Sequence, residues 1–319
     1  MTTRRALALA TLALATLALA ACATASSPRT PPPGAEAISL LGDTLRAPAL
    51  PAELRARRDA QLAAADSAWR ASPTADHLIW VGRRTAYLGR YRDAIAIFGD
   101  GVRRWPDDAR FLRHRGHRWI SVREIDRAVA DLERAHALVA GRADELEPDG
   151  LPNARNIPTS TLNGNIRYHL ALAYYLRGDF AKARPIWEED VRASVAARNA
   201  DMLVASSHWL YMTLRRLGRD EEARAVLAPI SRDMDVIENG AYHRLLLLYR
   251  GELPVESLVA RDAADPALDD ATVGYGVGNW HLYNGRKDEA ERVFRRVLAG
   301  GQWASFGYVA SEAELARMR

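Results

Sequence analysis

Histidine and arginine are the residues of this chain best placed for chemistry. His114 and His117 lie three residues apart in a segment of helical period, so their rings share one face and have the spacing of metal ligands. Arg113 stands beside them, and because a fixed cation opposes a second one, we expect no metal here. The sequence contains no Gly-x-Ser-x-Gly turn and no glycine-rich phosphate loop followed by lysine, and its one cysteine is Cys22. We therefore expect neither an enzyme nor a cofactor.

The charge balance argues against nucleic acid as a partner. The formal net charge is +4, but this includes Arg4 and Arg5 at the start, so the chain from Cys22 onward carries +2. Proteins that bind nucleic acid usually concentrate a large basic surplus on one face. We expect no nucleic-acid partner.

The first residues have the layout of a secretory signal. Arg4 and Arg5 precede an apolar run from Ala6 to Ala21, which is too short for a membrane span and ends in small residues. With a single thiol the chain cannot form an internal disulfide, so an exported protein of this length depends on its core for stability.

Leu19-Ala20-Ala21-Cys22 resembles the lipobox of bacterial lipoproteins. The resemblance implies that residues 1–21 are a signal peptide, that Cys22 is lipidated, and that the mature chain starts there. The residue after the cysteine is Ala23 and not an aspartate. By this resemblance, the protein is expected in the outer membrane, facing the periplasm. The alternative is an ordinary signal that happens to contain a cysteine.

Composition divides the rest into a tether and a folded part. Residues 22–50 begin with a Pro- and Ser-rich tract, which predicts a semi-rigid tether. From Ala52 onward apolar residues recur at three- and four-residue steps, without a convincing alternating pattern. The folded part, 51–319, is therefore predicted to be all-α.

The helices repeat along the chain. The turns between paired helices align at Gly89, Arg123, Gly178, Gly218, Gly251 and Gly285, with spacings of 34, 55, 40, 33 and 34 residues. A first unit carries Gly82, Gly89, Tyr91, Ala94, Phe98 and Pro106. Period and residues resemble the tetratricopeptide repeat (TPR), a helix-turn-helix unit that stacks into a solenoid. The resemblance implies an α-solenoid of about six TPR-like repeats, capped by helices at Pro51 to Ser72 and Glu312 to Arg319.

Two details of these repeats are predicted from spacing. A small residue in the middle of each first helix, such as Gly82, is expected to meet a small one early in the second, such as Ala94. The 55-residue spacing contains an insert at about 140–163, which is rich in turn formers and carries Leu151, Ile157 and Leu162. We expect this insert to be an ordered loop, with a disordered loop as the alternative.

By the same resemblance, the first helix of each pair lines a concave face. We call the residues predicted to bind a partner there the concave stripe. They are Trp80, Arg83, Tyr87, Arg110, Arg113, His114, His117, Asn165, Tyr168, His169, His208 and Trp209. The set is basic and aromatic, which suits carboxylate groups and large apolar contacts. The alternative is that these residues are only packing and solvated surface.

Two functions fit these observations. The first is a lipid-anchored, non-catalytic scaffold of the bacterial cell envelope, which binds a protein or peptide in the concave groove. The second is a periplasmic receptor or sequestering protein, in which the insert at 140–163 encloses a small anionic ligand against Arg83, Arg113 and His117.

Overall fold

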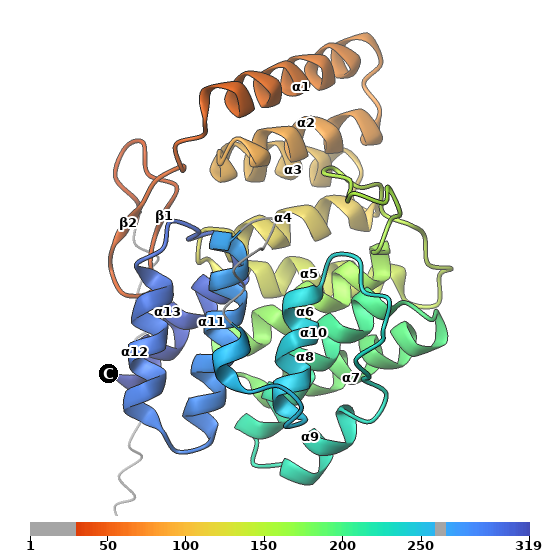
Figure 1. Ribbon diagram of the computed structural model, residues 1–319. Helices are drawn as coiled ribbons and strands as arrows, with labels where there is room; N and C mark the ends of the chain where they lie inside the picture. The colour runs from red at the N-terminus through yellow and green to blue at the C-terminus, as the bar shows by residue number, and fades with distance from the viewer. Residues whose placement is uncertain (1–29, 259–265) are drawn as a thin grey trace, which may run out of the picture.

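A computed structural model describes residues 30–258 and 266–319, which form consecutive α-helices and one short hairpin (Figure 1). The predicted signal peptide and Cys22 lie outside the described residues. The helices are α1 (Ala52–Ala71), α2 (Ala75–Tyr87), α3 (Tyr91–Arg104), α4 (Ala109–Ser121), α5 (Ile125–Val139), α6 (Leu162–Arg177), α7 (Phe180–Ala196), α8 (Ala200–Arg216), α9 (Asp220–Val226), α10 (Gly240–Tyr249), α11 (Pro266–Tyr283), α12 (Lys287–Leu298) and α13 (Phe306–Met318). Within this described part, no helix combines the length and apolar character needed to span a membrane.

The helices pack as consecutive pairs, so the predicted all-α solenoid is confirmed. The pairs are α2 with α3, α4 with α5, α6 with α7, α8 with α9, and α11 with α12. Between the last two pairs, α10 packs against α8 and α11, and a 3₁₀ turn (Val255–Leu258) follows it in place of a full second helix. Helix α1 caps the first pair, while α13 is the C-terminal cap and begins earlier than the predicted Glu312.

The turns confirm the repeat register. All six aligned positions have a positive φ, from 65° at Arg123 to 92° at Gly178. Glycine adopts this left-handed conformation without steric cost, whereas arginine does not. Arg123 therefore holds a strained turn that its side-chain contacts must stabilise.

The close approach of paired helices has a different cause from the one predicted. A Cβ atom on Gly82 would lie 2.3 Å from the Phe98 ring, so the glycine makes room for a large side chain. Equivalent pairs are Gly116 with Leu132 and Gly278 with Phe294. Ala94, which was expected to meet Gly82, is fully buried, but the atoms nearest to Gly82 belong to Phe98.

Part of the predicted tether is folded. Strands β1 (Ala37–Ile38) and β2 (Thr44–Leu45) form an antiparallel hairpin with Ala37 fully buried. Arg92 on α3 donates to the Glu36 carbonyl at 2.7 Å, and Trp303 donates to the Arg46 carbonyl at 2.8 Å. The Pro-rich composition of this segment did not predict the hairpin, because the hairpin is held by contacts with distant parts of the chain.

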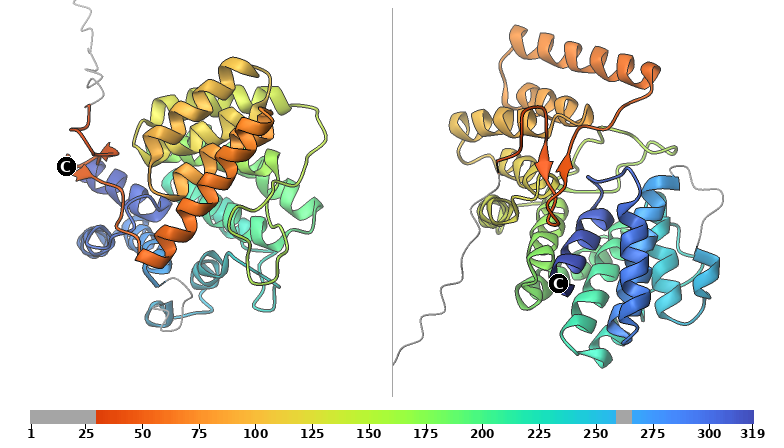
Figure 2. Two further views of the ribbon diagram at one scale, coloured as in Figure 1. Left: turned by 90° about the horizontal axis from the view of Figure 1, so that it is seen from above. Right: turned by 90° about the vertical axis from the view of Figure 1, so that its left-hand side faces the viewer.

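The stack closes on itself. Helix α13 packs against α6, and α11 packs against α8. In Figures 1 and 2 the C-terminal helices lie beside the β-hairpin, while the insert at 140–163 lies on the other side of the molecule. The C-terminal helices thus return to the face that the first helices were predicted to leave open.

Candidate partner surface on the concave face

Half of the concave stripe is buried by the protein itself. Six members are less than one-tenth exposed: Arg113, His114, Tyr168, His169, His208 and Trp209. Six are half-buried: Trp80, Arg83, Tyr87, Arg110, His117 and Asn165. The structure therefore does not present the predicted groove as one open surface.

The C-terminal end of the chain covers the middle of the stripe. The ring of Phe306, at the start of α13, lies 5.2 Å from that of His117, 5.6 Å from that of His169 and 6.0 Å from that of Tyr168, between centroids. Trp209 donates to the Tyr168 hydroxyl at 2.8 Å. These aromatic side chains pack the closure of the solenoid.

Helix α10 covers His208, a stripe residue on α8. The ring of Tyr242 lies 4.9 Å from that of His208, and its hydroxyl is 3.0 Å from the Tyr168 hydroxyl. Burial lowers the pKa of His208 to about 3, so its imidazole is neutral at ordinary pH. His208 is a core residue, outside the reach of a partner.

The insert covers the stripe on α4 and α6. Glu147 lies 2.9 Å from the Arg113 guanidinium, and Asn165 donates to Glu147 at 3.1 Å. Arg84 on α2 donates to the Gly150 carbonyl at 3.0 Å. The insert is ordered, in agreement with the favoured prediction, and Arg113 is committed to an internal ion pair.

The stripe histidines are neutral. Burial lowers the pKa values of His114, His117 and His169 well below the ordinary range, and nearby arginines lower them further. The His169 Nδ1 atom lies 2.6 Å from the Asn165 carbonyl, so Nδ1 carries the proton and donates. Among the described residues, no group of three or more His, Cys, Asp or Glu is arranged to hold a metal ion.

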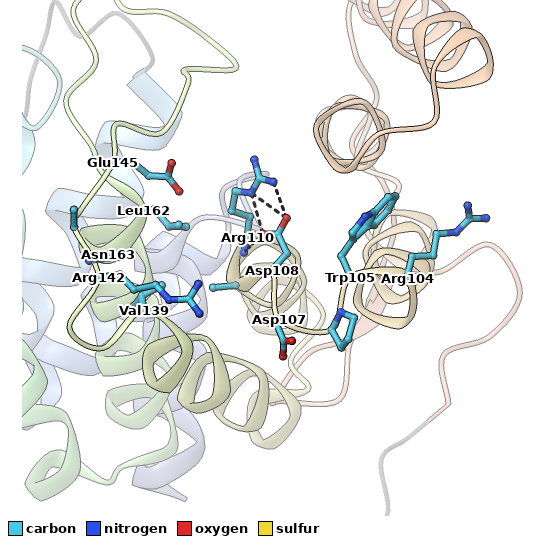
Figure 3. A pocket seen from close by; sticks show the side chains of 13 residues that line it. Arg104, Trp105, Asp107, Asp108, Arg110, Val139, Arg142, Glu145, Leu162 and Asn163 are labelled. Atoms are coloured by element: carbon cyan, nitrogen blue, oxygen red, sulfur yellow. Dashed lines mark hydrogen bonds and ion pairs between the residues drawn. The ribbon is translucent and has the colours of Figure 1, made fainter.

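Arg110 is also satisfied internally. Its guanidinium lies 2.6 Å from both Asp108 and Asp76, and the bonds to Asp108 and then Asp76 raise its pKa. Figure 3 shows Arg110 bonded to Asp108. Both line a pocket of about 490 Å³, together with Trp105 and Arg142. Two aspartates leave this arginine little free charge for a partner.

The first repeat keeps an accessible site. The Arg83 guanidinium lies 4.4 Å from the centre of the Trp80 ring, and that of Arg84 lies 4.9 Å from it. A hollow of about 220 Å³ opens beside them, bounded by the insert residues Leu146 and Glu147. Leu146 is 65% exposed, and Asp76, Glu145 and Glu147 also line the hollow, so apolar, cationic and acidic side chains meet here.

Arg118 lies next to the concave stripe but was not included in it. By the repeat resemblance, Arg115 and Arg118 stand at positions that are usually apolar or small, which was the signal that this helix is unusual. The Arg118 guanidinium lies 2.6 Å from His117 Nδ1 and 5.3 Å from the centre of the Tyr91 ring. Arg115, the other unusual residue of α4, is explained by an ion pair with Asp131 at 2.6 Å.

Comparisons with known proteins bear on the fold alone. No protein-family model matches the chain, and no curated protein matches it. One similar solved structure is YrrB, described as a TPR protein with an unusual peptide-binding site, with 14% identity over 75% of this chain and 92% of that one, at a TM-score of 0.42. Another is a tetratricopeptide repeat protein from Parabacteroides merdae, with 13% identity over 81% and 91%, at a TM-score of 0.46.

Proposed function

We propose that this chain is a non-catalytic, lipid-anchored scaffold of the bacterial cell envelope that binds a protein or peptide partner. Anchoring through Cys22 would place it in the outer membrane, facing the periplasm. The partner surface consists of Trp80, Arg83, Tyr87 and the neighbouring insert. It is smaller than the concave stripe, since the other members are buried or paired internally.

The observation that carries this proposal is that the first repeat is left partly uncovered, whereas other parts of the chain cover the concave face of the later repeats. The chain's own C-terminal helices and insert fill the face over α4, α6 and α8, but Trp80 and Arg83 stay half-buried beside a hollow. Tryptophan and arginine are the residue types that dominate binding hot spots. The surface suits a segment that presents an apolar side chain and a carboxylate.

The insert extends this surface outward. Leu146, Leu151 and Ile157 are 65%, 59% and 43% exposed, although large apolar side chains in an ordered loop are usually covered. The insert lies on the far side from the β-hairpin, where the described chain begins at residue 30 (Figure 2). A tether that starts beside the hairpin would leave the insert free to meet a partner.

The partner surface is tested by capture and titration. The immobilised protein should retain a partner from an envelope extract, and Trp80→Ala should weaken the complex by about 2 kcal/mol or more, roughly 30-fold. Arg83→Ala should weaken it and reduce its salt sensitivity, because exposed ion pairs are screened. Dissociation constants at two salt concentrations measure both effects.

A matched control separates loss of contact from loss of packing. Trp280 on α11 is half-buried and stacks on Arg286 at 4.3 Å, as Trp80 stacks on Arg83, but it lies far from the insert in sequence and does not line the hollow beside Trp80. Trp280→Ala should leave the affinity unchanged. Equal affinity of wild type and the Trp80→Ala, Arg83→Ala double variant would rule out this surface.

The anchor is tested by fractionation. Lipid chains bind a membrane far more tightly than a nearly neutral tether can, so Cys22→Ser should move the protein from the membrane to the soluble fraction. A high-salt wash removes proteins held only by charge. If the serine variant stays with washed membranes, Cys22 is not the anchor.

A further inference from the structure

The insert contains a short antiparallel ladder with one free edge. Leu146 and Thr161 stand opposite each other in it. The bonds across the ladder are made by the neighbours of Leu146: the Glu147 amide donates at 3.2 Å, and the Glu145 carbonyl accepts at 2.9 Å. In such a pair, the N–H and C=O of the opposed residues point away from the other strand. Leu146 therefore directs both of its backbone groups to the outer edge of residues 145–147.

This outer edge is unpaired. Within the described residues, neither the N–H nor the C=O of Leu146 is bonded to another group, and Leu146 is 65% exposed. In the β1–β2 hairpin, by contrast, Arg92 and Trp303 donate to the carbonyls of Glu36 and Arg46. Unpaired backbone groups at an exposed strand edge are a template for pairing with another chain.

The segment that carries the edge is fixed at two points. Glu147 pairs with the buried Arg113 at 2.9 Å, and Arg84 on α2 donates to the Gly150 carbonyl at 3.0 Å. Gly150 lies so close to the Tyr87 hydroxyl that a Cβ atom would not fit between them. Because the edge is already held in place, little conformational entropy is lost when a second strand joins it.

The hollow beside Trp80 and Arg83 adjoins this edge. Residues 145–148 line one side of the hollow, which holds about 220 Å³, and α2 and α4 contribute most of the rest. Its lining includes the apolar side chains of Ile79 and Leu162 as well as Trp80. The same part of the insert thus supplies an unpaired backbone edge and one side of a hollow that has room for an apolar side chain.

We propose that a partner protein binds this chain by adding an extended segment as a β-strand along residues 145–147. One residue of that segment exchanges two hydrogen bonds with Leu146, and an adjacent apolar side chain enters the hollow beside Trp80. A helix could not satisfy this edge, because its backbone groups are already bonded within it. In strand addition, main-chain bonds supply affinity and side-chain pockets supply specificity.

This inference rests on the proposed partner surface and deepens it by naming the conformation of the segment that binds there. The added ladder is short, because Pro148 has no N–H to extend it. The other possible occupant of the edge is the insert of a second copy of this chain. Sedimentation of the purified chain distinguishes the two, and we expect a monomer.

The test uses the purified chain and a phage-displayed library of random linear peptides. Peptides selected on wild type should bind Leu146→Pro at least tenfold more weakly, since proline has no N–H to donate. Leu146→Ala shortens the side chain but keeps the N–H, so it should retain more affinity than Leu146→Pro. Leu151→Pro, at an exposed residue of the insert outside the ladder, should bind like wild type.

Two measurements guard against a proline that merely distorts the insert. Both ladder bonds are donated by other residues, so the amides of Glu147 and Leu162 should exchange at wild-type rates in Leu146→Pro. The second measurement leaves the protein unchanged and N-methylates successive residues of a selected peptide. Binding should be lost at alternate positions and kept between them, because only alternate residues of a strand bond to the same neighbour.

The outcomes separate strand addition from the partner surface. Loss of binding in Leu146→Pro without loss in Trp80→Ala would support strand addition and remove Trp80 from the proposed surface. Loss in Trp80→Ala alone would keep that surface and overturn strand addition. The proposal also fails if no peptide prefers wild type to Leu146→Pro, if N-methylation gives no alternation, or if the chain forms a dimer that Leu146→Pro dissociates.

Discussion

Replacing Arg123 with methionine is expected to lower the free energy of unfolding by about 3–5 kcal/mol. Its guanidinium donates to both Glu312 oxygens, at 3.0 and 2.7 Å, and to the Trp303 carbonyl at 2.7 Å. Both side chains of the ion pair are almost fully buried. Methionine fills much of the space but leaves the Glu312 carboxylate enclosed without its cation. Denaturant unfolding of the purified protein measures the loss.

Three further variants check the cause. Arg127→Met removes an ion pair between the mostly exposed Arg127 side chain and Glu124, the residue before α5, and should cost less than about 1 kcal/mol. Arg123→Gly relaxes the positive φ but still loses the ion pair, so it should remain strongly destabilised. Adding Glu312→Leu to Arg123→Met should recover part of the loss, because no unpaired charge remains. A midpoint for Arg123→Met equal to that for Arg127→Met would contradict this account.

Glu147→Ala is expected to release the insert from the concave face. Glu147 neutralises the buried Arg113 and accepts a hydrogen bond from Asn165, so its loss leaves a buried cation unpaired. We expect a cost of about 3 kcal/mol, met mainly by local opening of the insert. Backbone amides of Glu147 and Leu162, which bond to Ser160 and Glu145, should exchange with solvent at least tenfold faster.

Glu145→Ala is the matched control for this variant. Glu145 belongs to the same insert, two residues earlier, but its side chain is exposed. Its substitution should leave amide exchange and resistance to proteolysis unchanged. If Glu145→Ala and Glu147→Ala open the insert equally, the Arg113 ion pair does not hold it.

The repeats could be predicted from the sequence because each helix and turn depends mainly on residues that are close together in the chain. The turns are set by a few consecutive residues, and the register placed Arg123 with five glycines before any geometry was considered. The cap helix at Ala52–Ala71 and the ordered insert follow from spacing and turn formers in the same way. Small residues such as Gly82 were found, but periodicity does not tell which large side chain faces them.

The side chains that fill the concave face could not be predicted from local sequence patterns. Its closure depends on contacts of Phe306 and Trp303 with residues much earlier in the chain. No local sequence pattern predicts such long-range contacts. The same reason explains the missed hairpin at 37–45. Arg118 was visible as an anomaly, but its packing against His117 and Tyr91 emerges only when every neighbour is placed.

The contact between Arg123 and Glu312 also bears on how the protein unfolds. In an open repeat array each unit touches only its neighbours, so the ends fray and the middle persists. Here a bond joins residues 189 positions apart, and the last helix secures the turn of the second repeat. Removing α13 should therefore loosen the amino-terminal half as well as the carboxy-terminal one. During synthesis, the first repeats stay incompletely stabilised until α13 has been made, which favours a chain that folds as one cooperative unit.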